Sequence, residues 1–235
     1  MPPIRASGPA SPGRAGLTPV PAKIGWTVEI TYLGLSCLRL RGRDVVVLVD
    51  PPATTLPGLG RSNPDIIVRT EGETVPERLR LREGQPQEVA GSGEFEVRGV
   101  TIHGLVSGET TIMRIEVDEV CVAAVGKLDR QLTEDEVDEL GRVDVLVVPV
   151  GGVDALGAVA ATKVVNAIAP SIVVPVRYRS SGVEGSGDYD PVDRFAKEMG
   201  LTDEALPTQP KLSLTGAMGT AEETRVVILE PRGAG

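Results

Sequence analysis

The sequence predicts an α+β protein in which two β-sheets pack face to face and helices cover their outer sides. Three observations support this fold class. About a dozen short segments alternate between apolar and polar residues or are apolar throughout, as strands are. Helix caps occur at only three segments, all in the second half of the 235-residue chain. Hydrophobic residues make up 41% of the sequence, which is enough for one sizeable core. Many strands with few helices favour stacked sheets.

The predicted strands start at residue 29, where the hydrophobic pattern changes to a period of two. Residues 29–33 alternate, and residues 45–49 form a continuous apolar run of the kind found in strands covered on both faces. Short turns at Arg98-Gly99 and Asp118-Glu119 predict two hairpins. The other strands are expected at residues 37–40, 65–68, 94–97, 100–103, 110–117, 120–125, 145–150, 172–176, 211–214 and 225–229.

Three helices are predicted from their end signals, because a polar cap precedes each one and glycine or proline follows it. The clearest is at residues 133–140, which open with a capping box formed by Thr133 and Glu136. The other two are expected at residues 155–169, with Asp154 as the N-cap, and at residues 191–199, with Asp190 as the N-cap.

The first 25 residues differ in composition from the rest of the chain. They contain six prolines, four glycines and no acidic residue. We therefore expect a flexible arm over residues 1–25 and a single domain over residues 26–235. A targeting peptide is the alternative for the arm, and its high proline content argues against that. The chain has neither an apolar stretch of roughly 20 residues nor the apolar core of a secretory signal, so we expect a cytoplasmic protein without a membrane partner.

Composition also limits the chemistry. The formal net charge of −9 argues against nucleic acid as a partner. Two cysteines, Cys37 and Cys121, are too few for a disulfide framework or a four-thiolate zinc site, and we expect both to be buried. The single histidine, His103, limits zinc chemistry and is expected to be a structural strand residue. Ser36 and Cys37 have no matched histidine base, so neither is expected to be a nucleophile.

Seven segments follow one another along the chain: ITYLGLSCLRL (30–40), VDP (49–51), GKL (126–128), DVLVVPVGG (144–152), APSIVVP (169–175), FAKEMG (195–200) and ETRVVILE (223–230). Together they resemble the metallo-β-lactamase-fold hydrolases, particularly the branch that contains the ascorbate-6-phosphate lactonase. The resemblance extends over residues 27–232. It implies a four-layer αββα sandwich with a metal site at one edge of the two sheets, and hydrolase activity.

The resemblance also implies where metal ligands would lie. The family binds one or two metal ions through a His-x-His-x-Asp-His loop, a later histidine, a bridging aspartate and a last histidine. None of these ligand types stands at the matching positions of this chain. In the family's ligand order, the matching residues are Glu71, Glu73, Val75, Pro76, Glu109, Lys127 and Arg177.

These replacements predict a site without metal. Catalysis in this fold depends on metal-bound hydroxide, whereas Lys127 and Arg177 would place positive charges where the divalent ions sit. If Glu71, Glu73 and Glu109 converge on these two cations, an ion-pair network replaces the metals as the link between the loops of both sheets. The alternative is that all five side chains are solvated loop charges.

We therefore predict a catalytically degenerate protein that uses no cofactor and binds a small molecule or a protein at the former active-site edge. In that site Asp50 is expected to order the neighbouring loop or to pair with a cation. One alternative is a lactonase- or phosphodiesterase-type hydrolase. It would use a hard cation held by Asp50, Glu71, Glu73 and Glu109, or acid–base chemistry by paired carboxylates. The other alternative is a structural protein that forms homo-oligomers.

Overall fold

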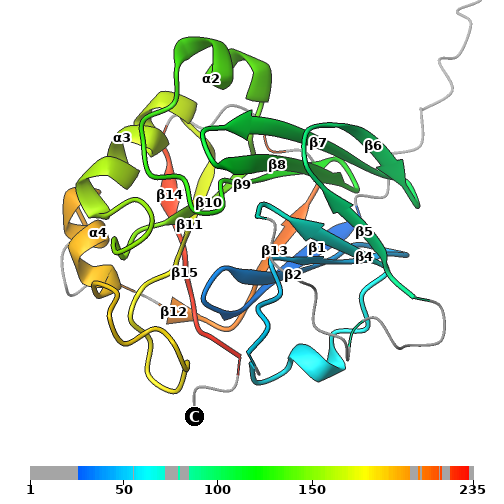
Figure 1. The fold of residues 1–235 in the computed structure, drawn as a ribbon, viewed down its shortest axis with the longest axis horizontal. Helices are drawn as coiled ribbons and strands as arrows, with labels where there is room; N and C mark the ends of the chain where they lie inside the picture. The colour runs from blue at the N-terminus through cyan, green and yellow to red at the C-terminus, as the bar shows by residue number, and fades with distance from the viewer. Residues whose placement is uncertain are drawn as a thin grey trace, which may run out of the picture.

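The computed structural model describes residues 26–54, 56–71, 79, 85–201, 206, 208–216, 218 and 223–232. Two β-sheets lie face to face (Figure 1). In spatial order, the first sheet consists of β13 (Leu212–Thr215), β1 (Thr27–Gly34), β2 (Cys37–Arg41), β3 (Val46–Val49), β4 (Ile66–Arg69) and β5 (Gln87–Ala90). The second consists of β14 (Arg225–Val226), β11 (Ile172–Val176), β10 (Val145–Pro149), β9 (Val120–Ala124), β8 (Thr110–Val117), β7 (Val100–Ser107) and β6 (Gly93–Val97). Strands β12 (Thr208–Gln209) and β15 (Ile228–Leu229) form a separate short pair.

Each sheet combines an antiparallel part with a parallel part. In the first sheet β3, β4 and β5 run parallel, and in the second sheet β9, β10, β11 and β14 do. The carboxyl ends of parallel neighbours meet at one edge of a sheet. The loops after β3 and β4 therefore leave one edge of the first sheet together, and the loops after β9, β10 and β11 leave one edge of the second.

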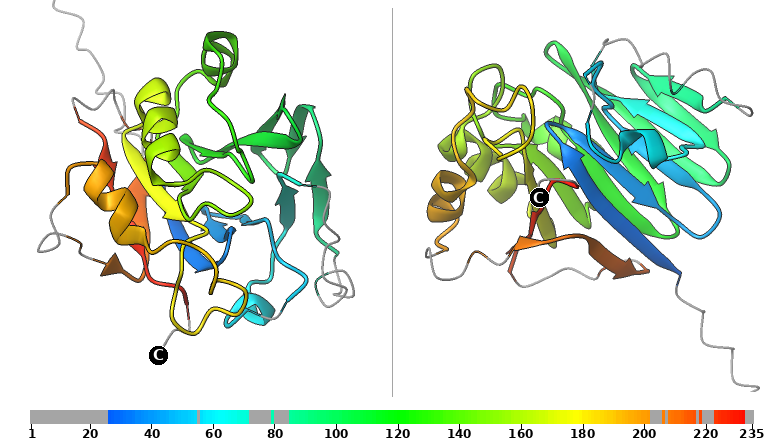
Figure 2. Two further views of the ribbon diagram at one scale, coloured as in Figure 1. Left: turned by 60° about the vertical axis from the view of Figure 1, so that its left-hand side comes forward. Right: turned by 90° about the horizontal axis from the view of Figure 1, so that it is seen from below.

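Helices cover the outer side of the second sheet. Helix α3 (Ala158–Ile168) packs on β10 and against α4 (Val192–Glu198), as Figure 2 shows. Helix α2 (Glu134–Leu140) follows β9 and contacts β7. On the outer side of the first sheet, the 3₁₀ helix η1 (Leu59–Arg61) contributes to a small apolar cluster. The predicted α+β sandwich is confirmed.

The strand period of two explains two separate apolar clusters. On β1, the alternate residues Val28, Ile30 and Tyr32 are fully buried in the main core, which includes residues of both sheets and of the covering helices. The next residue, Leu33, faces the opposite side and packs in the smaller cluster with Leu59 of η1. The first sheet is therefore buried on both faces where η1 lies over it.

Most predicted elements are present, and the differences lie at their ends. The capping box of Thr133 and Glu136 is confirmed, because both reciprocal hydrogen bonds form at the start of α2. Helix α3 begins three residues later than predicted, at Ala158, and Asp154 is not its cap. Strand β7 continues to Ser107, four residues past the predicted end. Strands β5 and β12 were not predicted.

Two further differences concern the C-terminal half. Helix α4 follows Pro191 without a side-chain cap, and Asp190 instead forms an ion pair with Arg194 at 2.7 Å. The strand predicted at residues 225–229 divides into β14 and β15, which belong to different sheets.

Both cysteines are buried, as predicted. None of the helices in the described part of the chain has the length and apolar character that a membrane crossing requires. The predicted arm at residues 1–25 lies outside the described residues.

Candidate functional site

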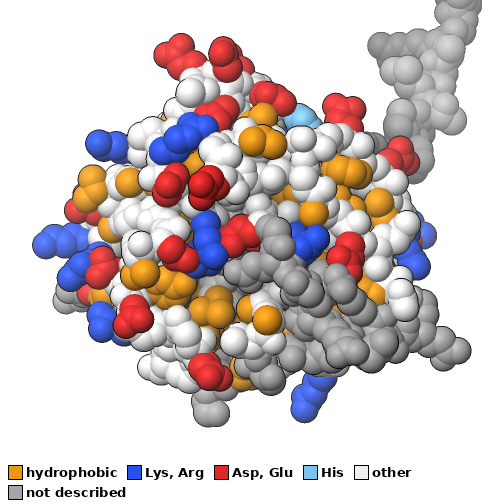
Figure 3. All heavy atoms as spheres, viewed as in Figure 1, with side chains coloured by type: hydrophobic (Ala, Val, Ile, Leu, Met, Phe, Trp, Pro, Cys, Tyr) orange, Lys and Arg blue, Asp and Glu red, His pale blue; other side chains and the backbone are white. Residues whose placement is uncertain are grey.

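A cavity of about 320 Å³ lies where the loops from the two sheet edges meet. The first sheet contributes the β1–β2 turn and the loops after β3 and β4, and the second contributes the loops after β9, β10 and β11. Charged side chains of both signs lie side by side on the face seen in Figure 3. The cavity is lined by Leu35, Ser36, Asp50, Pro51, Pro52, Ala53, Thr54, Arg69, Glu71, Lys127, Asp154, Arg177 and Tyr189.

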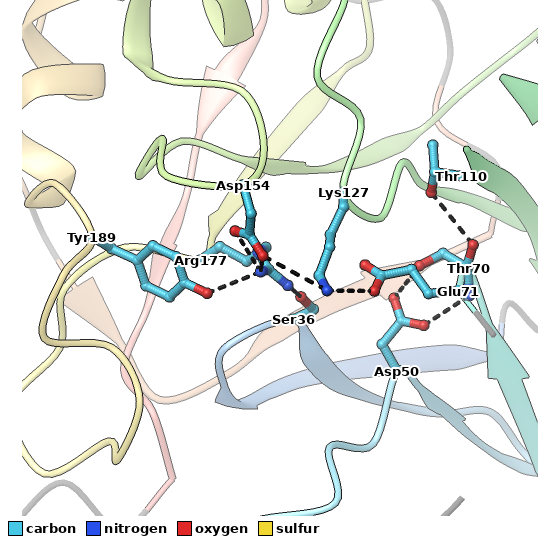
Figure 4. Close-up of polar contacts among 9 residues, drawn as sticks. All are labelled: Ser36, Asp50, Thr70, Glu71, Thr110, Lys127, Asp154, Arg177 and Tyr189. Carbon is cyan, nitrogen blue, oxygen red and sulfur yellow. Dashed lines mark hydrogen bonds and ion pairs between the residues drawn. The ribbon is translucent and has the colours of Figure 1, made fainter. Parts of the chain in front are cut away.

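Arg177 is the centre of the polar contacts in this cavity (Figure 4). Its Nη2 atom donates to both carboxylate oxygens of Asp154, at 2.7 and 2.6 Å, and to the hydroxyl of Tyr189 at 2.9 Å. Its Nη1 atom donates to the hydroxyl of Ser36 at 3.1 Å. The side chain is 9% exposed. Arg177 therefore ties the β1–β2 turn to two loops of the second sheet, and its charge is balanced within the protein.

Lys127 extends this network to the first sheet. Its Nζ atom lies 2.8 Å from Oε2 of Glu71 and 3.6 Å from Oδ2 of Asp154. Burial has the largest influence on Asp154 and raises its pKa, but the hydrogen bonds and charge of Arg177, with the charge of Lys127, together bring the pKa below its usual value. Negative and positive side chains thus alternate along a row of contacts that links the two sheets, in the order Glu71, Lys127, Asp154 and Arg177.

Asp50 follows β3 and holds the start of the loop after β4. Its Oδ1 accepts a hydrogen bond from the backbone N–H of Thr70 at 2.8 Å, and its Oδ2 accepts one from the Thr70 hydroxyl at 2.7 Å. Removal from bulk water raises the pKa of Asp50 to about 6, although the two hydrogen bonds from Thr70 act in the opposite direction. Asp50 is therefore a loop-ordering residue that is ready to exchange a proton near neutral pH.

Four non-glycine residues at or next to the cavity have a left-handed backbone. Leu35, Asp50 and Arg177 line it with φ angles of 54°, 44° and 53°, and Val153, next to Asp154, has a φ of 68°. The left-handed region costs a non-glycine residue about 1–2 kcal/mol. Such strain persists only where the surroundings over-determine the backbone, and it clusters at functional sites. The loops around this cavity are therefore held by their neighbours in conformations that they would not adopt alone.

A glycine makes the close approach of the two sheet edges possible. A Cβ atom at Gly126, just before Lys127, would collide with the side-chain oxygen of Thr70 and lie 2.6 Å from that of Thr110. Thr110 is buried and its hydroxyl donates to the backbone oxygen of Thr70 at 3.3 Å. Gly126 thus lets the loop that carries Lys127 reach the loop that carries Glu71.

The structure brings together four of the six residues that the sequence analysis assigned to the site, namely Asp50, Glu71, Lys127 and Arg177. Glu109 differs from the expectation, because it is exposed in the β7–β8 turn and does not line the cavity. Its neighbour Thr110 is the buried residue of this turn, and it contacts the backbone of Thr70. Glu73, like Val75 and Pro76, lies outside the described residues.

Two functional residues were missed from the sequence. Asp154 was assigned to a helix cap, and the structure shows it as the carboxylate that joins Arg177 and Lys127. Its position just after the Gly151-Gly152 pair, at the end of a buried strand, was the available signal. Tyr189 comes from the long loop before α4, and no local pattern marks it. His103 lies away from the cavity, with Nε2 at 3.5 Å from Oε1 of Glu139 on α2.

Comparison with known proteins identifies the family. The model of the β-lactamase superfamily domain matches residues 29–177, which include nearly all of the cavity-lining residues. The chain belongs to this family. Within the described residues, no group of three or more His, Cys, Asp or Glu side chains is arranged so that it could hold a metal ion.

Solved structures agree with this membership in the metallo-β-lactamase superfamily. A protein from Thermotoga maritima, assigned to the Zn-dependent hydrolases of the superfamily, is 25% identical, with a TM-score of 0.68 over 86% of this chain and 99% of its own. The metallo hydrolase Igni18 from Ignicoccus hospitalis is 18% identical, with a TM-score of 0.59 over 82% of this chain and 100% of its own. An isothiocyanate hydrolase from Delia radicum gut bacteria is 14% identical, with a TM-score of 0.54 over 82% of this chain and 100% of its own. No curated protein matches the chain.

Proposed function

We propose that this chain is a metal-independent member of the superfamily, without hydrolase activity, that binds a small molecule in the cavity. The observation that carries the proposal is the contact between Nζ of Lys127 and Oε2 of Glu71 at 2.8 Å. By the family resemblance, both residues stand where relatives carry metal ligands. In this proposal, an ion pair between the two residues takes the place of a shared metal ion. The proposal also places the chain in the branch that contains the ascorbate-6-phosphate lactonase.

Electrostatics supports a site without metal. A divalent cation at about 4 Å from an ammonium or guanidinium group would be opposed by roughly 8 kcal/mol at an effective dielectric constant near 20. Lys127 and Arg177 each impose such a cost, while Glu71 and Asp154 are already bound to these cations. These residues therefore do not fit a superfamily metal site.

The cavity suits a small ligand with a polar group and an apolar part. Its volume of about 320 Å³ is at the lower end of the range for small-molecule pockets. Leu35, Pro51 and Ala53 supply apolar surface, whereas Ser36 and Tyr189 supply hydroxyl groups. A protein partner that inserts one side chain would meet the same surfaces and is the alternative occupant.

The test combines metal analysis with ligand binding. Protein purified without chelator should contain less than stoichiometric zinc, manganese or iron by elemental analysis, and its melting temperature should not change with EDTA. In a thermal-shift screen of small polar metabolites, we expect compounds that stabilise the wild type and Lys163→Ala but not Ser36→Ala or Tyr189→Phe. Lys163 is the control because it is an exposed cation on α3, away from the cavity. Stoichiometric metal would contradict the proposal, and compounds that stabilise all variants equally would remove the cavity as their site.

A hydrolase that uses carboxylate acid–base chemistry is the second candidate, and Asp50 is the observation that favours it. Its pKa of about 6 lies in the range that suits a general base or acid near neutral pH. Turnover of lactone or phosphodiester substrates in the presence of EDTA, lost in Asp50→Asn, would support this candidate. Since asparagine can keep both contacts with Thr70, the loop should stay ordered in that variant. Absence of turnover in the wild type would exclude the hydrolase candidate and favour the binding function.

A further inference from the structure

Two arginines of β2 face away from the main core. Arg39 and Arg41 alternate with Leu38 and Leu40, which are fully buried between the sheets. Successive side chains of a strand point to opposite faces. Arg39 and Arg41 therefore project together from the outer face of the first sheet, beside strand β1.

The C-terminal segment brings a third arginine to the same face. The backbone N–H of Arg232 donates to the oxygen of Tyr32 on β1 at 3.0 Å. Its side chain lies against Gly58, where an added Cβ atom would be 3.3 Å from Cδ of Arg232. The pKa of Arg39 is lowered by burial and then by the charges of Arg41 and Arg232, so both of these guanidinium groups lie near that of Arg39.

The charges of this arginine cluster, Arg39, Arg41 and Arg232, are not balanced by the residues around it. Among the described residues, Glu29 is the carboxylate that acts on Arg39, and its Oε1 is already bound to Nζ of Lys211 at 3.0 Å. In the described part of the chain, no carboxylate forms an ion pair with the cluster. The buried Nε of Arg39 has no hydrogen-bond partner, which is also true of the Nε of Arg177. The chain has 33 acidic and 24 basic residues, so this local excess of positive charge is unusual for its composition.

We propose that the cluster of Arg39, Arg41 and Arg232 binds a small anion of the phosphate class, either inorganic phosphate or the phosphoryl group of a larger ligand. Guanidinium groups present planar pairs of N–H donors that match phosphate oxygens. A doubly charged anion relieves the mutual repulsion of three cations better than a single carboxylate does. The site is separate from the cavity, because none of the three arginines lines it.

The test titrates the full chain with inorganic phosphate and, in a second arm, with methyl phosphate, at constant ionic strength in a calorimeter. We expect saturable binding that weakens by about tenfold or more in Arg39→Gln and in Arg232→Gln. Lys163→Gln changes the net charge equally at a distant exposed position and should bind as the wild type does. Binding of both anions would identify the phosphoryl group as the recognised part, and binding of phosphate alone would identify the free ion.

Three results would overturn the proposal. Equal weakening in Arg39→Gln, Arg232→Gln and Lys163→Gln would show general charge attraction rather than a site. Loss of binding in Lys127→Met alone would place the anion in the cavity, and absence of saturable binding in the wild type would also contradict the proposal. Melting curves provide a second readout, because phosphate should raise the melting temperature of the wild type but not that of Arg39→Gln. Failure here leaves the proposed function of the cavity untouched, since that function is tested with other variants.

Discussion

Arginine has opposite surroundings in the cavity and on the outer face of the first sheet. In the cavity, Arg177 is buried and contacts Ser36, Asp154 and Tyr189. On the outer face, Arg39 has two arginines nearby, and its carboxylate neighbour Glu29 is bound to another cation. A charge within the sandwich is thus compensated by the chain itself, whereas a charge at the surface is left for solvent or a bound anion. The difference follows from the cost of burial, which is high for an unpaired charge.

The largest expected effect comes from removing the buried arginine. Arg177→Met should lower the free energy of unfolding by about 3–4 kcal/mol, because Asp154 loses its main partner and two hydroxyl groups lose a donor. Urea unfolding measures the change. Arg39→Met is the matched control, and it should be neutral or slightly stabilising because it reduces repulsion. Equal destabilisation by both substitutions would show that the charges of the two regions are compensated to the same extent.

Asp50→Asn should change the pH dependence of stability. The folded pKa of Asp50 is about 6, above its usual value of 3.8. The folded state therefore binds this proton more tightly than the unfolded state, so stability falls as pH rises from about 4 to about 6 and is constant above that. The asparagine variant does not lose stability in this way, and at pH 8 it should be more stable than the wild type by about 3 kcal/mol. Urea unfolding at pH 4, 6 and 8 measures the difference, which should shrink at pH 4. A difference that does not vary with pH would contradict the raised pKa.

Lys127→Met should have a smaller effect than loss of Arg177. The side chain of Lys127 is 31% exposed, so solvent screens its interactions with Glu71 and Asp154 more than it screens those of Arg177. We expect destabilisation of about 1–2 kcal/mol. The effects of Lys127→Met and Arg177→Met should not add in the double variant, because both cations share Asp154. Additive losses would mean that the two ion pairs are independent.

Local features of the sequence were sufficient to predict most helices and strands. The alternation at residues 29–33 and the capping box of Thr133 and Glu136 depend only on neighbours within a few positions, and both match the structure. Strand β5, by contrast, has one buried residue, Val89, and therefore shows little periodicity. Asp154 was misassigned because an aspartate before an apolar helix favours a cap, while its actual partner, Arg177, lies 23 positions away.

The sequence by itself determined that this protein has two stacked sheets, and its resemblance to the family implied that Lys127 and Arg177 stand where relatives carry metal ligands. Both follow from residue type and order, which are present before folding. Only the tertiary structure decided which charges meet. Parallel strands place the loops after β3, β4, β9, β10 and β11 at adjoining edges, so Glu71, Lys127, Asp154 and Arg177 come into contact while Glu109 turns outward. Contacts between distant segments depend on strand order and length, and a single sequence carries no local record of either.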